Sequence, residues 1–196
     1  MSYYMEFLKI WNYIIFISLL FILTNSSVNT LHYVYGFFHS GNQQVNFIPY
    51  ENTKLKINIQ YPSNWQKEER LNDFVTFVAP ILDTSQYIYP AGLGISSMSL
   101  SNVSLNAIKN VHIKNLTDNL KDFQLIESSD TVLADKRPAK KIVFTAMDGE
   151  EKRQSLQLIT KNNDKIYLFT YKAVLDQYDK YFPIIQTMLN SLIFLK

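Results

Sequence analysis

The chain has 196 residues, of which 47% are hydrophobic and 18% charged, with a formal net charge of +2 and no cysteine. This apolar fraction is typical of a packed globular protein and excludes wholesale disorder. The missing cysteine excludes disulfides, thiol nucleophiles and cysteine-ligated metal centres, and the near-balance of charge gives no basis for nucleic-acid binding. The length fits one domain with an appendage.

An apolar block of fourteen residues, 10–23, lies near the N-terminus. Lys9 precedes it and small polar residues follow it, which is the three-part pattern of a secretory signal. Glu6 weakens that pattern, and an uncleaved anchor is the alternative, although fourteen helical residues span only about 21 Å of a hydrocarbon core about 30 Å thick. We therefore predict a hydrophobic helix in residues 1–27, either a signal peptide or a membrane anchor. Both alternatives carry the rest of the chain across a membrane.

Three N-x-[ST] sequons, at Asn25, Asn102 and Asn115, are compatible with that export. In a chain this rich in asparagine, such sequons also arise by chance. Glycosylation at these positions therefore stays open.

Residues 28–46 are predicted to be a connector with a cluster of aromatic residues between Leu31 and Phe38. The cluster could lie at a membrane interface or pack on the domain, and the sequence favours neither. His32 and His39 flank it, but no Asp or Glu between residues 28 and 50 completes a metal site, so no metal is predicted there.

From Phe47 to Lys196 the pattern is that of a strand-rich domain. Apolar and polar residues alternate from Leu55 to Tyr61, which predicts a half-buried strand. The dipeptide Asp148-Gly149 is a strong hairpin signal, and consecutive strands joined by tight turns are antiparallel. Residues 81–92 are predicted to be a loop. Further strands are predicted at residues 74–78, 94–100, 123–127, 141–146, 153–160 and 166–171.

Two helices complete the expected α+β fold, an antiparallel sheet flanked by helices. Ser104 is a good N-cap for a helix that ends near Leu120, with His112 as a partly exposed residue at its flank. Near the C-terminus, residues 176–181 are predicted to form a first turn and Pro183 to begin the main helix. The apolar stripe of this last helix is expected to pack across the sheet.

Several short motifs follow one another in an order that resembles PsbP-like domains over residues 47–196. They are Tyr61-Pro62-Ser63-Asn64-Trp65 and Phe77-Val78-Ala79-Pro80 at two strand ends, the corner Arg137-Pro138-Ala139, the strand Tyr167–Tyr171, and the tail Met188–Phe194, with Leu192 where Phe is usual. Each motif is weakly specific by itself, whereas their order is more specific. The resemblance implies an α/β/α sandwich with a central antiparallel sheet.

The best-known member of that family is an extrinsic subunit of the oxygen-evolving complex of photosystem II, and related domains occur in exported bacterial and archaeal proteins. The metal-binding and photosystem-docking motifs of the plant subunit are not visible in this sequence. Its activity is therefore not carried over, and no catalytic residue, metal site or cofactor is predicted. The N-terminal block does not read as a plastid transit peptide, which would be rich in Ser and Arg.

Two charged clusters have functional interpretations that compete with plain surface roles. Asp148, Glu150 and Glu151 could hold a hard cation such as calcium, but a solvated turn is the preferred interpretation. A basic run could dock on anionic lipid or a polyanionic polymer, and a charged turn is again preferred. The residues of this run are Lys136, Arg137, Lys140 and Lys141. The pair Gly92 and Gly94 opens a strand rather than a helix, so it is not a phosphate-binding loop.

Three hypotheses for function remain. The first is a non-enzymatic accessory or docking protein that is held outside the cytoplasmic membrane by its N-terminal helix and binds a protein partner. The second is a carrier of a small ligand or lipid, with an aromatic cleft between the sheet and the C-terminal helix, and the third is a hydrolase. The aromatic residues considered for the cleft are Tyr167, Phe169, Tyr171, Tyr178 and Tyr181.

Overall fold

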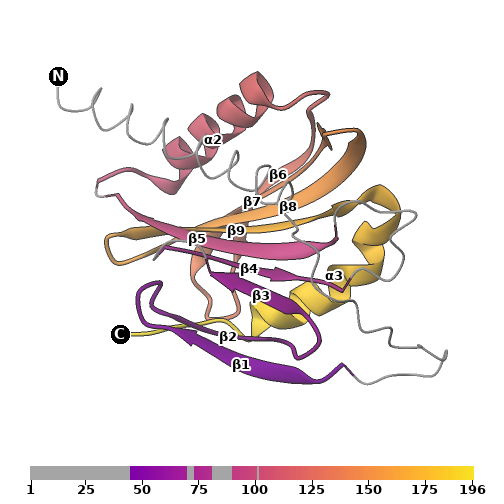
Figure 1. Ribbon diagram of the computed structural model, residues 1–196. Coiled ribbons are helices and arrows are strands. Elements are labelled where there is room, and N and C mark those ends of the chain that lie inside the picture. The colour runs from indigo at the N-terminus through magenta and orange to yellow at the C-terminus, as the bar shows by residue number, and fades with distance from the viewer. Residues whose placement is uncertain (1–44, 70–72, 81–89, 101) are drawn as a thin grey trace. The chain divides into compact units, whose positions relative to one another are not determined.

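The computed structural model describes residues 45–69, 73–80, 90–100 and 102–196 (Figure 1). Residues Phe47 to Lys196 form one compact unit. The hydrophobic helix predicted in residues 1–27, nearly all of the predicted connector and most of the predicted loop at 81–92 lie outside the described residues. Among the helices in the described part of the chain, none combines the length and apolar character needed to cross a membrane.

The main layer is a seven-stranded sheet in which every neighbouring pair is antiparallel. Its spatial order is β3-β4-β5-β9-β8-β7-β6, so β9 inserts between β5 and β8. The strands span Gln66–Glu69 (β3), Phe74–Val78 (β4), Gly92–Ser99 (β5), Gln124–Val132 (β6), Pro138–Asp148 (β7), Glu151–Asn162 (β8) and Lys165–Val174 (β9).

A second sheet has three strands in the order β1-β2-β10. They span Phe47–Asn52 (β1), Ile57–Pro62 (β2) and Ile193–Phe194 (β10). The predicted alternation is confirmed in β2, because Ile57 and Ile59 are fully buried. The expectation of a single sheet is wrong: the turn that follows β2 is closed by a hydrogen bond from Trp65 N to the carbonyl of Pro62, and the chain then enters the larger sheet.

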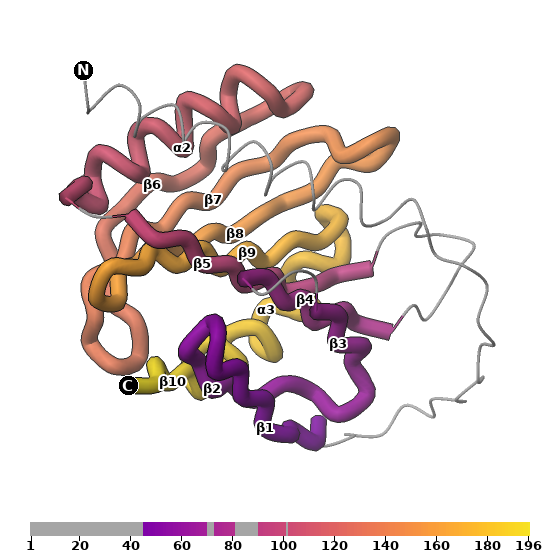
Figure 2. The backbone as a smooth tube through the Cα atoms, turned by 60° about the vertical axis from the view of Figure 1, so that its left-hand side comes forward, coloured from indigo at the N-terminus to yellow at the C-terminus, as the bar shows by residue number. Residues whose placement is uncertain are grey.

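Two helices lie on opposite faces of the seven-stranded sheet (Figures 1 and 2). Helix α2, Leu105–Asn119, packs on β7 and β8, whereas α3, Leu175–Asn190, packs on β8, β9 and β2. The small sheet lies on the same side as α3. This arrangement is the expected α/β/α sandwich with the small sheet added beside α3.

The main core fills the space between the α3 face of the sheet, α3 and the small sheet. Pairing of β9 with its neighbours places Tyr167, Phe169 and Tyr171 on this face, and all three are essentially fully buried. The phenol of Tyr171 donates to the carbonyl of Tyr178 on α3 at 2.6 Å, and the phenol of Tyr167 donates to the carbonyl of Leu55 at 2.8 Å. Aromatic packing and two buried hydrogen bonds therefore join the three parts.

The predicted helix ends agree with the structure for α2 and differ for α3. The side chain of Ser104 caps α2 by accepting from Ala107 N at 3.1 Å. At the C-terminus, one continuous helix replaces the predicted first turn and separate main helix, and Pro183 lies inside it. Proline within a helix removes one backbone donor, but the buried residues of α3 on both sides of Pro183 hold the helix against the sheet.

Candidate functional site

A cluster of four charged side chains lies at one end of the seven-stranded sheet, where the β7–β8 hairpin and the β9–α3 junction are adjacent (Figure 1). Asp148 ends β7, Glu151 and Arg153 begin β8, and Lys172 lies near the end of β9. Arg153 and Lys172 are both buried. Buried charges of this kind are rare in proteins unless they are paired, so the cluster is the first candidate for a site.

Each charge of this cluster has an opposite charge beside it. Lys172 Nζ lies 2.6 Å from Asp148 Oδ2, and Arg153 Nη1 lies 3.5 Å from the same oxygen. Arg153 Nη2 lies 3.4 Å from Glu151 Oε2. Two cations and two carboxylates thus share a small buried volume and leave no net charge, and they tie β7, β8 and β9 together.

The pKa of the Lys172 amine is lowered to about 8, mainly by burial; Asp148 opposes this shift and nearby Arg153 contributes to it. A lysine with a pKa near neutrality can act as a nucleophile when it faces a substrate. Here the ammonium is hydrogen-bonded to a carboxylate inside the fold. The contacts therefore assign Lys172 a role in holding the strands together.

The register of two hairpins brings these residues together. The two-residue turn at Gly149 and Glu150 pairs Asp148 with Glu151, and the next same-face pair is Ala146 with Arg153. The β8–β9 hairpin pairs Ser155 with Lys172. No sequence motif identified Arg153 or Lys172 as candidate site residues. The alternation of the strands could have identified them, since both residues share a strand face with other polar residues in otherwise apolar strands.

The hairpin carboxylates had two sequence interpretations, a calcium site and a solvated turn, and neither describes Asp148. Its side chain is largely buried and forms ion pairs with Lys172 and Arg153. No group of three or more His, Cys, Asp or Glu residues placed to hold a metal is found in the part of the chain that the structure describes. Asp148 and Glu151, which flank the turn, therefore belong to a structural ion-pair network, whereas Glu150 within the turn is exposed, as the solvated-turn interpretation predicts.

A second buried polar group joins α2 to the sheet. His112 is 2% exposed, and its Nε2 lies 2.6 Å from Oε1 of Gln157 on β8. Gln157 Nε2 in turn donates to Thr170 Oγ1 on β9 at 3.3 Å. Burial lowers the pKa of His112, so the neutral imidazole is favoured and it donates to the amide oxygen.

The prediction that His112 is partly exposed at the flank of the helix is wrong. The apolar stripe expected in this helix consists of Leu105, Ile108, Val111, Leu116 and Leu120, and the burial of Ile108 and Leu116 is confirmed. The helix is rotated so that His112 and Asn115 complete its buried side, whereas Leu105, Val111 and Leu120 are only partly buried. The reason is that Gln157 on the sheet offers a hydrogen-bond partner that no local pattern reveals. The same rotation buries the sequon residue Asn115, so a glycan there is incompatible with the packing of α2.

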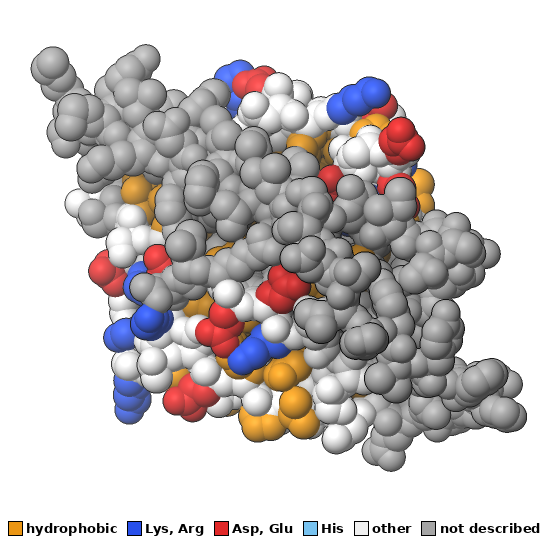
Figure 3. Space-filling view, viewed as in Figure 1, with side chains coloured by type: hydrophobic (Ala, Val, Ile, Leu, Met, Phe, Trp, Pro, Cys, Tyr) orange, Lys and Arg blue, Asp and Glu red, His pale blue; other side chains and the backbone are white. Residues whose placement is uncertain are grey.

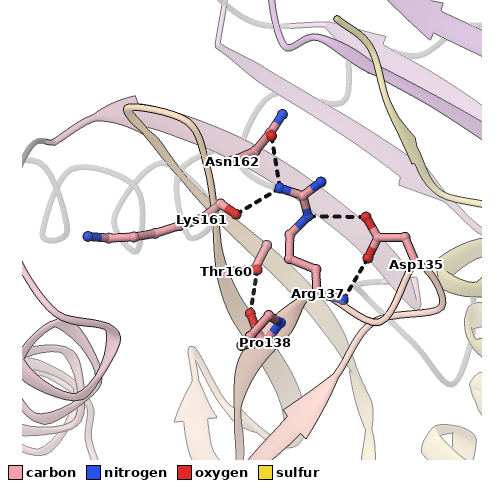
Figure 4. A network of polar contacts seen from close by, with 6 residues as sticks. All are labelled: Asp135, Arg137, Pro138, Thr160, Lys161 and Asn162. Carbon is pink, nitrogen blue, oxygen red and sulfur yellow. Dashed lines mark hydrogen bonds and ion pairs between the residues drawn. The ribbon is translucent and has the colours of Figure 1, made fainter.

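Arg137, from the predicted basic run, lies in a polar network at the opposite end of β8 (Figure 4). Its Nε lies 3.1 Å from Asp135 Oδ2, and its Nη1 donates to the carbonyl of Lys161 and to Asn162 Oδ1. The guanidinium also lies 4.4 Å from the ring centroid of Phe194 in β10. Arg137 therefore fixes the β6–β7 turn to the β8–β9 turn and to the C-terminal strand.

Two lysines of the basic run are also paired with carboxylates. Lys140 Nζ lies 2.6 Å from Asp130 Oδ1, and Lys141 Nζ lies 2.8 Å from Glu127 Oε2, both across the β6–β7 pair. On the face shown in Figure 3, acidic and basic side chains are interspersed where described residues are visible. Lys136 and Arg137 lie in the β6–β7 turn, as the charged-turn interpretation predicts, whereas Lys140 and Lys141 lie in strand β7. The ion pairs of the run favour a structural role over a polyanion-binding patch.

The aromatic residues considered for a ligand cleft pack against one another. The rings of Tyr171 and Tyr178 lie 4.8 Å apart between centroids, and those of Tyr178 and Phe182 lie 5.8 Å apart in a stacked arrangement. Tyr181 packs edge-on against Trp65. These rings occupy the space between the sheet and α3 that the cleft hypothesis requires.

The chain was compared with known proteins. The sequence family described as PsbP-like protein matches residues 14–194. This match includes part of the apolar block and the whole of the predicted connector in addition to the compact unit. No curated protein is similar enough in sequence to match the chain.

Several solved structures share the fold at low sequence identity. CyanoP, the cyanobacterial PsbP of Synechocystis sp. PCC 6803, has 14% identity and a TM-score of 0.57, and the alignment covers 81% of this chain and 98% of CyanoP. LpqN of Mycobacterium tuberculosis, described as involved in cell envelope biogenesis, has 11% identity and a TM-score of 0.57, with 79% and 94% of the two chains covered. A protein of unknown function from Pseudomonas aeruginosa has 13% identity and a TM-score of 0.56, with 75% and 96% covered.

Proposed function

Because the chain belongs to the PsbP-like protein family, we propose that it is a non-enzymatic accessory protein that works outside the cytoplasmic membrane and docks on a protein partner there. In this proposal residues 1–27 are the signal or anchor, residues 28–46 are a connector, and residues 47–196 are the PsbP-like domain. The observation that carries the proposal is the family match over residues 14–194, which extends from the domain into the apolar N-terminal block.

The chemistry of the described residues supports an accessory role. The groups with the most unusual environments, Lys172, Arg153 and His112, all take part in ion pairs or hydrogen bonds that join one strand or helix to another. A catalytic group must instead reach a substrate atom at hydrogen-bond distance. The placement of these groups therefore favours a protein that acts by binding.

An extracytoplasmic location is supported by the apolar block at residues 10–23 and by one structural neighbour, LpqN, whose description refers to the cell envelope. Transfer across the membrane would occur whether the block is cleaved or retained. The mature N-terminus separates the two: intact Met1 on membrane-bound protein indicates an anchor, and a new N-terminus after about residue 26 indicates a signal peptide.

The location is tested by fractionating cells that express the chain with a C-terminal tag. We expect the tag outside the cytoplasmic membrane, in the membrane or the secreted fraction. The variant Ile17→Arg introduces a charge at the centre of the apolar block and is expected to leave the protein in the cytoplasm, because an arginine there costs about 2.5–3.5 kcal/mol on insertion. Ile17→Leu is the matched control and should behave like the natural chain. A cytoplasmic location of the natural chain would contradict the proposal.

The docking role is tested by gentle crosslinking of the tagged chain in cells, followed by purification and mass spectrometry. We expect a crosslinked species that contains a second, different protein, which the cytoplasmic Ile17→Arg variant does not capture. Recovery of the chain without any other protein would contradict the docking role. A species made of two copies of this chain does not count as a docking partner.

A further inference from the structure

The two edges of the seven-stranded sheet differ in a way that points to an interaction surface. Strand β3, at one edge, has four residues, and three of them are Lys67, Glu68 and Glu69. Strand β6, at the other edge of the sheet as the described residues form it, has nine residues. Short and charged edge strands are a usual protection against pairing with another chain. Strand β6 is more than twice as long as β3 and has only two charged residues, Glu127 and Asp130.

Strand β6 also exposes apolar side chains. Ile126 is 57% exposed and Val132 is 63% exposed, and Leu125 is exposed beside them. None of the nine residues of β6 is buried. The main contacts of helix α2 with the sheet are with β7 and β8, one and two strands in from this edge. Exposed apolar side chains along an edge strand favour pairing with a further strand, which would cover them.

The charged residues of β6 restrict which strand can pair with it. Glu127 and Asp130 point to opposite faces of the sheet, because Glu127 pairs with Val143 and Asp130 with Lys140. Each carboxylate already has a lysine of β7 beside it, Lys141 and Lys140 respectively. An incoming strand therefore meets no net charge on β6, but it must not place a further carboxylate opposite either residue.

We propose that the occupant is a second copy of this chain, paired antiparallel through β6 about a two-fold axis at Ser129. In this register Glu127 lies opposite Thr131 of the second copy, and Ser128 lies opposite Asp130. Each carboxylate thus faces a hydroxyl group that can donate to it, and no two carboxylates oppose each other. Ile126, the extra residue of the β-bulge, and Val132 of the second copy lie at each end of this paired stretch, so pairing places the exposed apolar side chains next to each other.

Other antiparallel registers are worse for a second copy. Opposed residues must share a face of the sheet, so an axis through a residue between Glu127 and Val132 keeps the alternation, whereas an axis between two residues breaks it. Moving the axis by one residue to Asp130 places two carboxylates directly opposite each other, which is destabilising. The bulge between Leu125 and Glu127 confines regular pairing to the stretch that begins after it. The self-complementary register at Ser129 satisfies all three conditions.

The absence of cysteine from the chain provides a direct test. We would introduce one cysteine into the full chain, purified in detergent, and measure disulfide-linked dimer under mild oxidation. Ser129→Cys is expected to crosslink efficiently, because residues opposed across an antiparallel pair have Cα atoms about 4.5–5.5 Å apart, within the range that a disulfide spans. Thr131→Cys is the matched control, since its two copies are offset by about 13 Å along the strands and are too far apart to be bridged.

A second measurement separates this pairing from contacts between the N-terminal segments. Ile126→Lys places a charge in the interface, and it should reduce the Ser129→Cys crosslink about tenfold and convert the natural chain from dimer to monomer in analytical ultracentrifugation. Leu175→Lys changes another exposed apolar residue, at the start of α3, and should leave both readouts unchanged.

A monomeric natural chain, or equal crosslinking by Ser129→Cys and Thr131→Cys, would overturn the proposal, and so would a dimer that Ile126→Lys leaves intact. Crosslinking of the cysteine to a different protein instead of a second copy would assign the edge to another partner and would also overturn it. These results do not depend on whether the chain docks on a membrane protein, because the readout is the pairing of two copies.

Discussion

The two faces of the seven-stranded sheet differ in the interactions that stabilise them. The α3 face is aromatic and aliphatic, with Phe77, Leu93 and Phe169 fully or almost fully buried. The α2 face mixes aliphatic residues with the buried polar and charged groups Ser96, Gln157, Arg153 and Lys172, although the same strands supply both faces. The α3 face depends on the removal of apolar surface from water, whereas the α2 face depends on each buried charge finding its partner.

The largest effect should come from the apolar face. Phe169→Ala removes an essentially buried ring that packs beside Tyr167 and leaves a cavity in the main core. We expect a loss of about 3–5 kcal/mol in the free energy of unfolding, measured by urea denaturation. Phe169→Leu keeps most of the volume and is expected to cost about 1.5 kcal/mol or less. Equal losses in the two variants would show that volume in this core is not what stabilises the fold.

The polar face is tested by two aspartate–lysine pairs of similar length. Asp148 and Lys172 are 2.6 Å apart and buried, whereas Asp118 and Lys114 are 2.9 Å apart and exposed on α2. Asp148→Asn leaves two buried cations with less compensation and should cost about 3 kcal/mol, whereas Asp118→Asn should cost about 0.5 kcal/mol or less. Both values come from urea denaturation.

The double variant Asp148→Asn/Lys172→Met sharpens the same test. Removing both partners of the buried pair leaves no uncompensated lysine, so part of the loss caused by Asp148→Asn should be recovered. If the double variant loses more free energy of unfolding than the two single variants lose together, the Asp148–Lys172 pair is not the unit that stabilises this end of the sheet.

The two faces should respond oppositely to alkaline pH. The pKa of Lys172 is about 8 in the fold, below its ordinary value of 10.5, so between these values the unfolded chain binds more protons and the free energy of unfolding rises with pH. This rise is at most about 3 kcal/mol. Burial raises the pKa of Tyr171, Tyr178 and Tyr181 above their ordinary value of 10.0, so above that pH the unfolded chain ionises first and stability falls. The combined contribution of these four groups to stability should therefore be largest near pH 10.

Urea denaturation between about pH 7 and pH 11 measures these slopes. Lys172→Met should flatten the rise above pH 8, and Tyr171→Phe should reduce the fall above pH 10 without changing the rise. Identical pH dependence in the natural chain and in Lys172→Met would contradict the assignment of the rise to the buried amine.

The smallest effect is expected at acid pH, from His112. Because burial lowers the pKa of this imidazole below 6.5, its contribution to stability is complete above pH 6.5 and is lost as the pH falls further, when the unfolded chain takes up the proton first. His112→Leu should remove this part of the pH dependence, whatever its effect on absolute stability. Parallel pH profiles for the two chains between about pH 7 and pH 5 would contradict it.

Local signals predicted the elements that depend on local chemistry. Ser104 begins α2 because a hydroxyl can accept from the first turn, and Asp148-Gly149 closes a hairpin because glycine adopts the positive φ of 63° that the turn requires. Local signals gave wrong predictions where the environment of a residue is set by residues that are distant in the sequence. Pro183 resembles a helix start, but packing of α3 on the sheet keeps the helix continuous through it. His112 resembles a surface residue until Gln157 is placed beneath it.

Local sequence patterns were enough to predict the α+β class, the antiparallel pairing of consecutive strands and the family resemblance, because alternation, turn residues and caps act over a few residues. The three-dimensional fold was needed to show that β9 lies between β5 and β8 and that β1 and β2 form a separate sheet with β10. It was also needed to show that Asp148, Arg153 and Lys172 are in contact. These arrangements depend on contacts between residues far apart in the chain. The partner of a buried charge or an edge strand is fixed by what the fold brings next to it, and a local pattern does not contain that information.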